Sequence, residues 1–256
     1  RKQEKMEERL NKWLSQMGVC SRREADRLIE AGKVLVDNRP ASMGQKVTPG
    51  QKVVCNGKMV RVDRSQRPRP VLLAVNKPKG VVCTTTDKDR AENIVDFLGY
   101  PERIYPVGRL DKDSEGLLLM TNQGDLVNKI MRSGNAHEKE YIVTIDKPVT
   151  EHFLEQMAGG IRLPELDQVT RPCKVKKVDR NTFSIILTQG LNRQIRRMCE
   201  ACGCQVKRLV RVRIMNIRLG NLRTGAYRQI TKEEYEELTG LLKDSSSLSL
   251  KERKNQ

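Results

Sequence analysis

The sequence has few aromatic residues and few histidines, and both shortages restrict its chemistry. Phe, Trp and Tyr together account for 4% of the chain, which argues against a large stacking platform for single-stranded nucleic acid. The two histidines, His137 and His152, lie far along the sequence from the cluster of Cys199, Cys202 and Cys204. A structural zinc site requires four such ligands, so this cluster is better explained by small apolar packing. We therefore expect no bound metal ion.

Long apolar segments are also missing. The sequence contains no run of about 18 apolar residues, which a membrane-spanning helix would require, and no secretory signal pattern. It also lacks a long amphipathic helix with a bulky apolar face, which would favour a membrane surface. Seven cysteines, an odd number, fit thiols that stay reduced. We expect a cytoplasmic protein that has no membrane partner and is a monomer.

Acidic residues are scarce relative to basic ones. The chain has 49 Lys and Arg against 32 Asp and Glu, which gives a formal net charge of +17. Such an excess favours a polyanionic partner, and nucleic acid is the simplest choice. The excess is concentrated in residues 1–70, which hold 17 basic and 8 acidic residues. An ordinary solvated basic surface is the alternative explanation for this segment.

The first part of the chain, residues 1–66, has the pattern of a small folded domain. Four apolar residues at helical spacing predict its first helix: Leu10, Trp13, Leu14 and Met17. The capping-box pattern Ser21-Arg-Arg-Glu24 predicts the start of a second helix, and Gly32 predicts its end. Short strands are predicted around Val36 and Val53, because valines next to turn residues favour strands.

A linker is predicted at residues 64–70, because their prolines and arginines offer no apolar face. We place a second domain at residues 67–243 and a disordered polar tail at residues 244–256. The second domain has strand-like runs such as Leu117–Met120, separated helical segments and no regular βαβ rhythm. This pattern predicts an α+β fold with a mixed, largely antiparallel sheet.

Residues 108–121, which we call the acid loop, place a group of acids directly before an apolar run. Four of them match the first half of an EF-hand calcium loop: Asp111, Asp113, Glu115 and Gly116. The second half does not match, because the position that needs a bidentate Glu is Asn122 and a strand is predicted where a helix should follow. We therefore interpret Asp111 as a candidate catalytic residue on a loop anchored by rigid structure.

A cationic helix is predicted near the C-terminal end of the second domain. The segment Gln189–Met198 contains a glycine turn that opens a helix. Its apolar stripe consists of Ile195, Met198, Cys199 and Cys202. From Leu191 to Arg213, both included, there are seven Lys and Arg but one Glu, which is dense for a merely solvated helix. This surface is therefore expected to bind a nucleic-acid backbone.

Several of these segments resemble one known family. The acid loop is similar to the signature of the pseudouridine synthases, in particular the RsuA family of ribosomal enzymes. The turn Asn76-Lys-Pro-Lys-Gly80, the segment His137-Glu-Lys-Glu-Tyr141 and the cationic helix are similar to that family as well. Residues 8–60 resemble the small RNA-binding domain named after ribosomal protein S4. The resemblance implies a small N-terminal S4-like RNA-binding domain followed by a pseudouridine synthase catalytic domain.

The same resemblance implies that the chain isomerises uridine to pseudouridine without a cofactor. Asp111 matches the catalytic aspartate, and Tyr141 matches an active-site tyrosine that lies under the uracil. Arg196 matches the arginine beside that aspartate, where its guanidinium would orient the carboxylate. Leu209 matches a leucine that packs near the base, although both Tyr141 and Leu209 would otherwise be interpreted as core residues. The sequence leaves open whether Asp111 attacks the sugar, attacks the base or acts through a glycal.

A structured RNA hides its uridines, so the target must be flipped out at a cost of about a few kcal/mol. Ten residues are predicted to contact RNA: Arg22, Arg23, Arg109, Leu110, Lys112, Asn192, Arg193, Gln194, Ile195 and Arg197. Arg109 would enter the vacated space or clamp the backbone, and Asn192 with the helix start would bind a phosphate. Lys77 and Lys79 are either phosphate contacts or exposed turn lysines.

The resemblance also bears on the RNA partner. The stretch Arg213-Ile-Met-Asn216, together with residues 137–141, is most similar to large-subunit enzymes of the family, which implies ribosomal RNA of the large subunit as substrate. A uridine of small-subunit or transfer RNA is one alternative, because surface loops decide substrate choice. A non-catalytic RNA-binding ribosome assembly factor is another. Both classes of protein would bind RNA in a salt-dependent way, so only the chemistry separates them.

Overall fold

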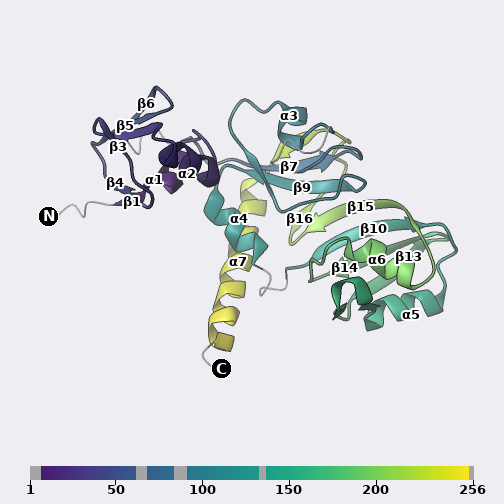
Figure 1. The fold of residues 1–256 in the computed structure, drawn as a ribbon. Helices are drawn as coiled ribbons and strands as arrows, with labels where there is room; N and C mark the ends of the chain where they lie inside the picture. Colours follow the sequence, from purple (N-terminus) through teal and green to yellow (C-terminus); the bar gives the residue numbers. More distant parts are fainter. Residues whose placement is uncertain (1–6, 62–67, 84–90, 133–136, 254–256) are drawn as a thin grey trace. The chain divides into compact units, whose positions relative to one another are not determined.

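The computed structural model describes residues 7–61, 68–83, 91–132 and 137–253 (Figure 1). The chain forms two compact units. The first unit holds the residues up to Val71 together with Pro101–Arg103 and Asn122–Gly124, and the second unit holds the rest. The predicted domain boundary falls within residues 62–67, which lie outside the described residues.

The first unit begins with two helices, α1 (Leu10–Gln16) and α2 (Arg22–Glu30). The Oγ atom of Ser21 accepts a hydrogen bond of 3.0 Å from the backbone N–H of Glu24. This contact confirms the predicted N-cap of the second helix. The predicted apolar stripe of the first helix is buried in a core shared with Ala25, Ile29 and valines of the following strands.

The strands of the first unit form a four-stranded antiparallel sheet and a separate two-stranded pair. The sheet has the order β3 (Arg39–Pro40), β2 (Val34–Val36), β5 (Lys52–Cys55) and β6 (Lys58–Arg61). The pair joins β1 (Glu8–Arg9) to β4 (Lys46–Val47). The strands predicted around Val36 and Val53 are therefore confirmed as hydrogen-bonded neighbours.

The second unit is built on a nine-stranded sheet. Seven strands lie in the order β13 (Lys174–Asp179), β14 (Thr182–Leu187), β10 (Lys139–Ile145), β15 (Val206–Ile214), β9 (Glu115–Thr121), β7 (Leu72–Lys77) and β17 (Tyr227–Gln229). In addition, β16 (Ile217–Arg218) pairs with β15, and β8 (Tyr105–Val107) pairs with β9. Strands β9 and β15 are parallel, whereas the other pairs of this sheet are antiparallel. This arrangement confirms the predicted α+β class with a mixed, largely antiparallel sheet.

Helices cover the two halves of this sheet with separate apolar cores. Helices α5 (Glu151–Gly159) and α6 (Gln194–Ala201) pack with β10 and β14, whereas α4 (Gly124–Met131) and α7 (Lys232–Arg253) pack with β7 and β9. The smaller elements are α3 (Ile94–Leu98), the 3-10 turn η3 (Pro164–Leu166) and the hairpin of β11 (Arg162–Leu163) and β12 (Gln168–Val169). Among the helices that the structure describes, none has both the length and the apolar character needed to cross a bilayer.

The last helix starts with a reciprocal cap. The Oγ1 atom of Thr231 accepts from the backbone N–H of Glu234, and a Glu234 carboxylate oxygen accepts from the N–H of Thr231, both at 3.1 Å. Hydrogen bonds from Arg228 lower the pKa of Glu234 to about 2. The helix continues to Arg253, which differs from the disorder expected from residue 244. Extending a nucleated helix costs little, and composition alone does not reveal this.

The two halves of the sheet meet where β9 runs beside β15. Their register pairs Glu115 with Val210 and Gly116 with Arg211. The φ angle of Gly116 is +107°, and a Cβ atom at this position would lie 2.2 Å from the carbonyl oxygen of Arg211. Only glycine fits such an approach. Gly116 therefore sets the distance between the two halves, directly after the acids of the acid loop.

Replacing Gly116 with alanine is expected to destabilise the protein by about 3 kcal/mol or more, because overpacking and a strained φ each cost about 1–3 kcal/mol. Urea unfolding of the full chain measures the change. Gly159→Ala is the matched control, because Gly159 ends α5 and no atom lies within 4 Å of the added Cβ. The control should keep or raise the free energy of unfolding. Equal stability of the two variants would contradict this account of the β9–β15 contact.

Candidate active site

The first part of the acid loop, residues 108–114, connects β8 to β9, where the two halves of the sheet meet. Backbone contacts fix its course. The carbonyl of Asp111 accepts from the N–H of Ser114 at 3.0 Å, and the carbonyl of Lys112 accepts from the N–H of Gly80 at 2.7 Å. The Nζ atom of Lys77, at the end of β7, donates to the same Lys112 carbonyl at 3.4 Å. The loop is therefore anchored from the neighbouring strand.

Lys77 is completely buried. It is therefore neither a phosphate contact on the surface nor an exposed turn lysine, the two interpretations that the sequence offered. Burial lowers the pKa of its ammonium group, while Cys83 and the carboxylates of the acid loop act in the opposite direction. Its Nζ atom donates to the carbonyl of Pro78 at 2.9 Å as well as to Lys112. Lys77 therefore supports the loop, whereas Lys79 is exposed.

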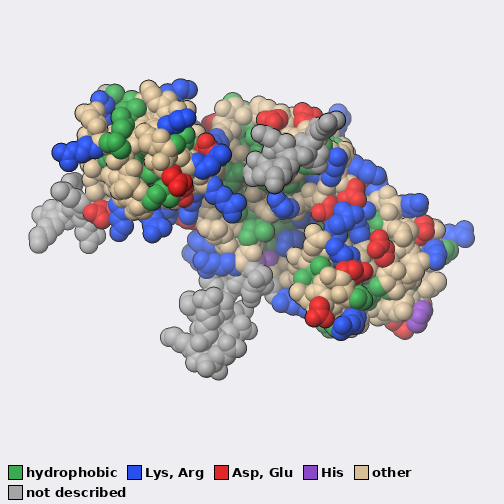
Figure 2. Space-filling model, viewed as in Figure 1, with side chains coloured by type: hydrophobic (Ala, Val, Ile, Leu, Met, Phe, Trp, Pro, Cys, Tyr) green, Lys and Arg blue, Asp and Glu red, His purple; other side chains and the backbone are tan. Residues whose placement is uncertain are grey.

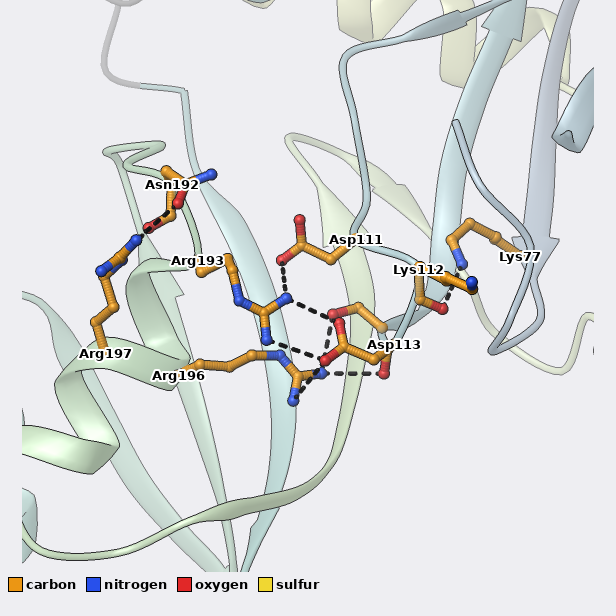
Figure 3. Close-up of polar contacts among 9 residues, drawn as sticks. Lys77, Asp111, Lys112, Asp113, Asn192, Arg193, Arg196 and Arg197 are labelled. Atoms are coloured by element: carbon orange, nitrogen blue, oxygen red, sulfur yellow. Dashed lines mark hydrogen bonds and ion pairs between the residues drawn. The ribbon is translucent and has the colours of Figure 1, made fainter. Parts of the chain in front are cut away.

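Two arginines from the start of α6 meet the carboxylates of the acid loop (Figure 3). The guanidinium of Arg193 donates to both carboxylate oxygens of Asp113 at 3.0 Å, and its Nη1 atom lies 3.6 Å from Oδ2 of Asp111. The Nη2 atom of Arg196 donates to the carbonyl of Asp113 at 3.0 Å and to Oγ of Ser114 at 3.2 Å. Arg193 thus bridges the two acids, and Arg196 holds the backbone beneath them.

This arrangement contradicts the expected pairing of Arg196 with Asp111, because Arg193 takes that place. Arg193 precedes Gln194, the first residue of α6, and its φ of +50° is left-handed. Figure 3 shows the Arg193 side chain directed between Asp111 and Asp113. A left-handed arginine is uncommon, and neither spacing nor composition predicts one. The motif therefore identified the correct helix but the wrong arginine.

Asp113 fixes Arg193 in position. The hydrogen bonds from Arg193 lower the pKa of Asp113, and the same contact raises the pKa of Arg193. Asp113 therefore stays a carboxylate that holds the guanidinium next to Asp111. In Figure 3 the second carboxylate oxygen of Asp111 turns away from Arg193. The contact with Arg193 therefore uses one of the two Asp111 carboxylate oxygens.

Asp111 lines a cavity of about 440 Å³, which we call the catalytic cavity. Tyr141 from β10 and Leu209 from β15 line it as well. Tyr141 is paired with Arg211 across these strands, so both side chains leave the same face of the sheet. The register shifts beside this pair, which makes Val212 a β-bulge. Arg211 alternates with Leu209 on the regularly paired part of β15 before the bulge, so both side chains share the face that lines the cavity.

Arg211 is a site residue that the sequence analysis missed. It is 4% exposed, its Nε atom donates to the carbonyl of Leu117 at 2.7 Å, and its Nη1 atom donates to the carbonyl of Arg109 at 3.4 Å. Arg211 therefore binds the backbone on both sides of Asp111, at Arg109 and at Leu117. Its Nη2 atom is buried and has no hydrogen-bond partner within the described part of the chain. The mixed basic and apolar pattern of β15 gave no sign of an inward arginine.

The predicted RNA contacts are split between exposed and buried positions. Arg109 and Lys112 are exposed on the acid loop, and Arg22 and Arg23 are exposed on α2 of the first unit. Leu110, Gln194 and Ile195 are buried, although all three border the catalytic cavity. Gln194 accepts from the N–H of Leu191 at 3.1 Å, so its amide holds the turn before α6. These three residues can therefore meet RNA through the cavity and not from the open surface.

The last two predicted contacts bind each other. The Nε and Nη2 atoms of Arg197 donate to the carbonyl and the side-chain oxygen of Asn192, both at 2.9 Å. Figure 3 shows Arg197 directed toward Asn192 and away from the acids. The side-chain oxygen of Asn192 is therefore occupied, whereas Arg197 does not use the Nδ2 donor of that amide.

The acids that matched half of a calcium loop have arginine partners instead. Arg193 lies beside Asp111 and Asp113, and Arg208 pairs with Glu115 at 3.0 Å. All seven cysteines are free thiols, and burial raises the pKa of several of them, including Cys83. In the ranges that the structure describes, no group of three or more His, Cys, Asp or Glu side chains is placed to hold a metal ion.

Comparisons with known proteins agree with the site. A family model for RNA pseudouridylate synthase matches residues 71–201, and a model for the S4 domain matches residues 8–53. Dual-specificity RNA pseudouridine synthase RluF of Escherichia coli (strain K12) is 52% identical over 239 residues, which cover 93% of this chain and 81% of the relative. Residues 137–141 and 213–216 point to RluF in particular, and this match agrees.

Two further comparisons extend the similarity. Ribosomal large subunit pseudouridine synthase B of Bacillus subtilis (strain 168) is 35% identical over 240 residues, which cover 91% of this chain and 96% of the relative. A crystal structure of a pseudouridylate synthase superposes with a TM-score of 0.65 and 28% identity, covering 90% of this chain and 99% of that one. With the acid loop, the cavity and both family models in agreement, the chain belongs to the RsuA branch of the RNA pseudouridylate synthase family, in which an S4 domain precedes the catalytic domain.

Proposed function

We propose that this chain isomerises a specific uridine of large-subunit ribosomal RNA to pseudouridine. One observation carries the proposal: Asp111 is the single acidic residue among the described residues that line the catalytic cavity. The similarity to a ribosomal large subunit pseudouridine synthase supports the choice of RNA. An assembly factor without catalysis would have no need for a half-exposed carboxylate held by an arginine inside a cavity.

The reaction exchanges one bond of the nucleoside for another. The bond between N1 of uracil and C1′ of ribose breaks, and its electron pair leaves with the uracil. The detached ring then turns inside the cavity, C5 bonds to C1′, C5 loses its proton, and N1 gains one. Substrate and product are isomers, so the reaction consumes neither an oxidant nor a second substrate, and we propose that no cofactor takes part.

The cavity provides a group for each part of this reaction. Asp111 acts on the flipped nucleotide, because its free carboxylate oxygen is turned away from Arg193. The ring of Tyr141 and the apolar side chain of Leu209 provide walls against which the uracil packs while it is detached. Arg109 is exposed where the acid loop borders the cavity, and it is placed to contact the RNA from which the base is flipped.

The first unit contributes affinity. Figure 2 shows many Lys and Arg side chains on the face in view, with fewer Asp and Glu among them. On α2, Arg22, Arg23 and Arg27 are exposed, and Arg27 pairs with Glu24 of the same helix. Exposed cations on a short helix neutralise phosphates without reading sequence, so this helix adds salt-sensitive binding to the catalytic domain.

The proposed function also bears on cellular location and oligomeric state. We propose a cytoplasmic protein that has no membrane partner, which the free thiols and an RNA substrate support. We also propose that one chain is sufficient for catalysis, because residues of a single chain form the catalytic cavity.

Asp111→Asn should abolish the conversion of uridine to pseudouridine in a ribosomal RNA fragment, because the amide is neither a nucleophile nor a base. RNA affinity should change less than about threefold, since Arg193 keeps Asp113 as its partner. Pseudouridine mapping and fluorescence anisotropy measure the two quantities. The control is Asp179→Asn, an exposed acid on β13, which should retain full conversion. Conversion by the Asp111 variant at the wild-type rate would remove the basis of the proposal.

The two arginines of α6 should differ in what they contribute. Arg193→Gln should lower the single-turnover rate by about a hundredfold with little loss of stability, because one charged partner of Asp111 is lost at a half-exposed position. Arg196→Gln should instead lower the free energy of unfolding by about 1–3 kcal/mol, because it leaves the Asp113 carbonyl without its donor. Rate measurements and urea unfolding of both variants test this division. The reverse pattern would restore Arg196 as the partner of Asp111.

Replacing Arg22 and Arg23 together with alanine should weaken RNA binding. The negative slope of log affinity against log salt concentration should become shallower by about two, because each phosphate contact contributes about one. The single-turnover rate at saturating RNA should stay unchanged, since neither residue lies in the second unit, which holds the catalytic cavity and which we call the catalytic unit. Arg27→Ala is the matched control, because Glu24 already pairs with its charge. A fall in the saturating rate, or an unchanged salt slope, would contradict this role.

A further inference from the structure

A second cavity, of about 330 Å³, lies in the catalytic unit and has a basic lining. Its charged and titratable residues are Arg132, His137, Lys139 and Arg171. Gln168 and Gln189 add amide groups, and none of the described residues that line the cavity is acidic. The pseudouridine reaction as described above does not use this cavity, and its volume is in the range of small-ligand sites.

The basic groups of the second cavity lack anionic partners within the described protein. Lys139 lies between Glu138 and Glu140 in sequence, but both carboxylates pair with Arg213 on β15, at 3.1 and 3.3 Å. Burial lowers the pKa of Lys139, and the nearby Arg211 lowers it further. Among the residues that the structure describes, no acid therefore pairs with the Lys139 ammonium, although its side chain is partly buried.

His137 gives a second, independent sign of a ligand. It is 6% exposed, and its Nε2 atom is buried without a hydrogen-bond partner in the described part of the chain. Burial lowers the pKa of His137, with Lys139 acting in the same direction, so the ring is neutral near pH 7. A buried, unpartnered polar atom is costly unless a bound molecule satisfies it. The cavity is therefore built for a molecule that carries both an anionic group and hydrogen-bonding groups.

The second cavity adjoins the catalytic cavity. Lys139, Met131, Gln189 and Leu191 line both of them. Arg211, whose Nη2 atom is buried and unpartnered, lines the catalytic cavity close enough to Lys139 to influence its pKa. A strand of RNA whose uridine occupies the catalytic cavity therefore has a basic compartment next to that uridine.

We propose that the second cavity binds the nucleotide that is adjacent in the RNA chain to the flipped uridine. Its phosphate lies against Arg132, Lys139 and Arg171, and its base meets His137 and the amides of Gln168 and Gln189. This inference rests on the proposed function, because the catalytic cavity supplies the uridine to which the nucleotide is joined. The enzyme then fixes two consecutive nucleotides, and the second of them contributes to the choice of uridine.

The test replaces single phosphates of the RNA by neutral methylphosphonates, one at a time, on both sides of the target uridine. Binding of each RNA to the full-length wild-type protein, Arg171→Ala and Arg132→Ala is measured by anisotropy. One flanking methylphosphonate should weaken wild-type binding about tenfold, as expected for the loss of a charge-assisted hydrogen bond. The same replacement should have less than about a twofold effect in the Arg171 variant, because the partner of that phosphate has already been removed.

Arg180→Ala is the matched control, because Arg180 is an exposed arginine of the same unit that lines neither cavity. It should keep the full tenfold effect of the flanking methylphosphonate. If the phosphate effect is the same in the Arg171, Arg132 and Arg180 variants at every flanking position, the inference is wrong. A second result would also overturn the inference: millimolar inorganic phosphate weakens wild-type RNA binding, but the methylphosphonate effect does not depend on the arginine variant. The cavity would then be a site for a free anion.

Pseudouridine formation is read from the same wild-type samples, which separates the two claims. Conversion of the uridine without phosphate coupling would leave the proposed function intact and remove the second cavity from RNA binding. Coupling without conversion would remove the proposed function and keep the cavity as an RNA site.

Discussion

The close parallel approach of β9 and β15 at Gly116 determines the rest of the catalytic unit. Each half of the sheet has its own helices and its own apolar core, and these two strands join the halves. Without a Cβ atom at Gly116, the backbone of Arg211 comes close enough for its guanidinium to reach the carbonyls of Leu117 and Arg109. The acid-bearing residues of the acid loop lead directly into this junction, so structure packed on two cores holds that end of the loop.

The three acids of the acid loop differ in how closely they pair with arginines. Glu115 pairs with Arg208 across the junction, and Asp113 holds Arg193 with two hydrogen bonds. Asp111 receives the remaining contact of Arg193 at a longer distance and is the acid that faces the catalytic cavity. Because Asp113 takes both strong hydrogen bonds of Arg193, a single longer contact is left for Asp111. Its carboxylate is therefore oriented without being fully engaged.

The sequence predicted features that depend on local pattern or on a resemblance, and it failed where the outcome depends on backbone detail. The apolar run 117–120 formed a central strand, and Ser21 capped its helix. The partner of Asp111 was assigned to Arg196, because a left-handed φ at Arg193 has no sequence signal. Arg211 was missed because it alternates with Leu209 on a buried strand face, and the sequence pattern does not show which face of a mixed basic and apolar strand is buried.

The central claim is that this chain makes pseudouridine at a uridine of large-subunit ribosomal RNA, through Asp111. Site-by-site pseudouridine mapping of RNA from cells lacking the protein tests it most directly, with wild-type protein or Asp111→Asn supplied back. The account predicts that a large-subunit signal disappears, returns with the wild type, and stays absent with the variant. An unchanged map, or a loss confined to small-subunit or transfer RNA, would contradict it.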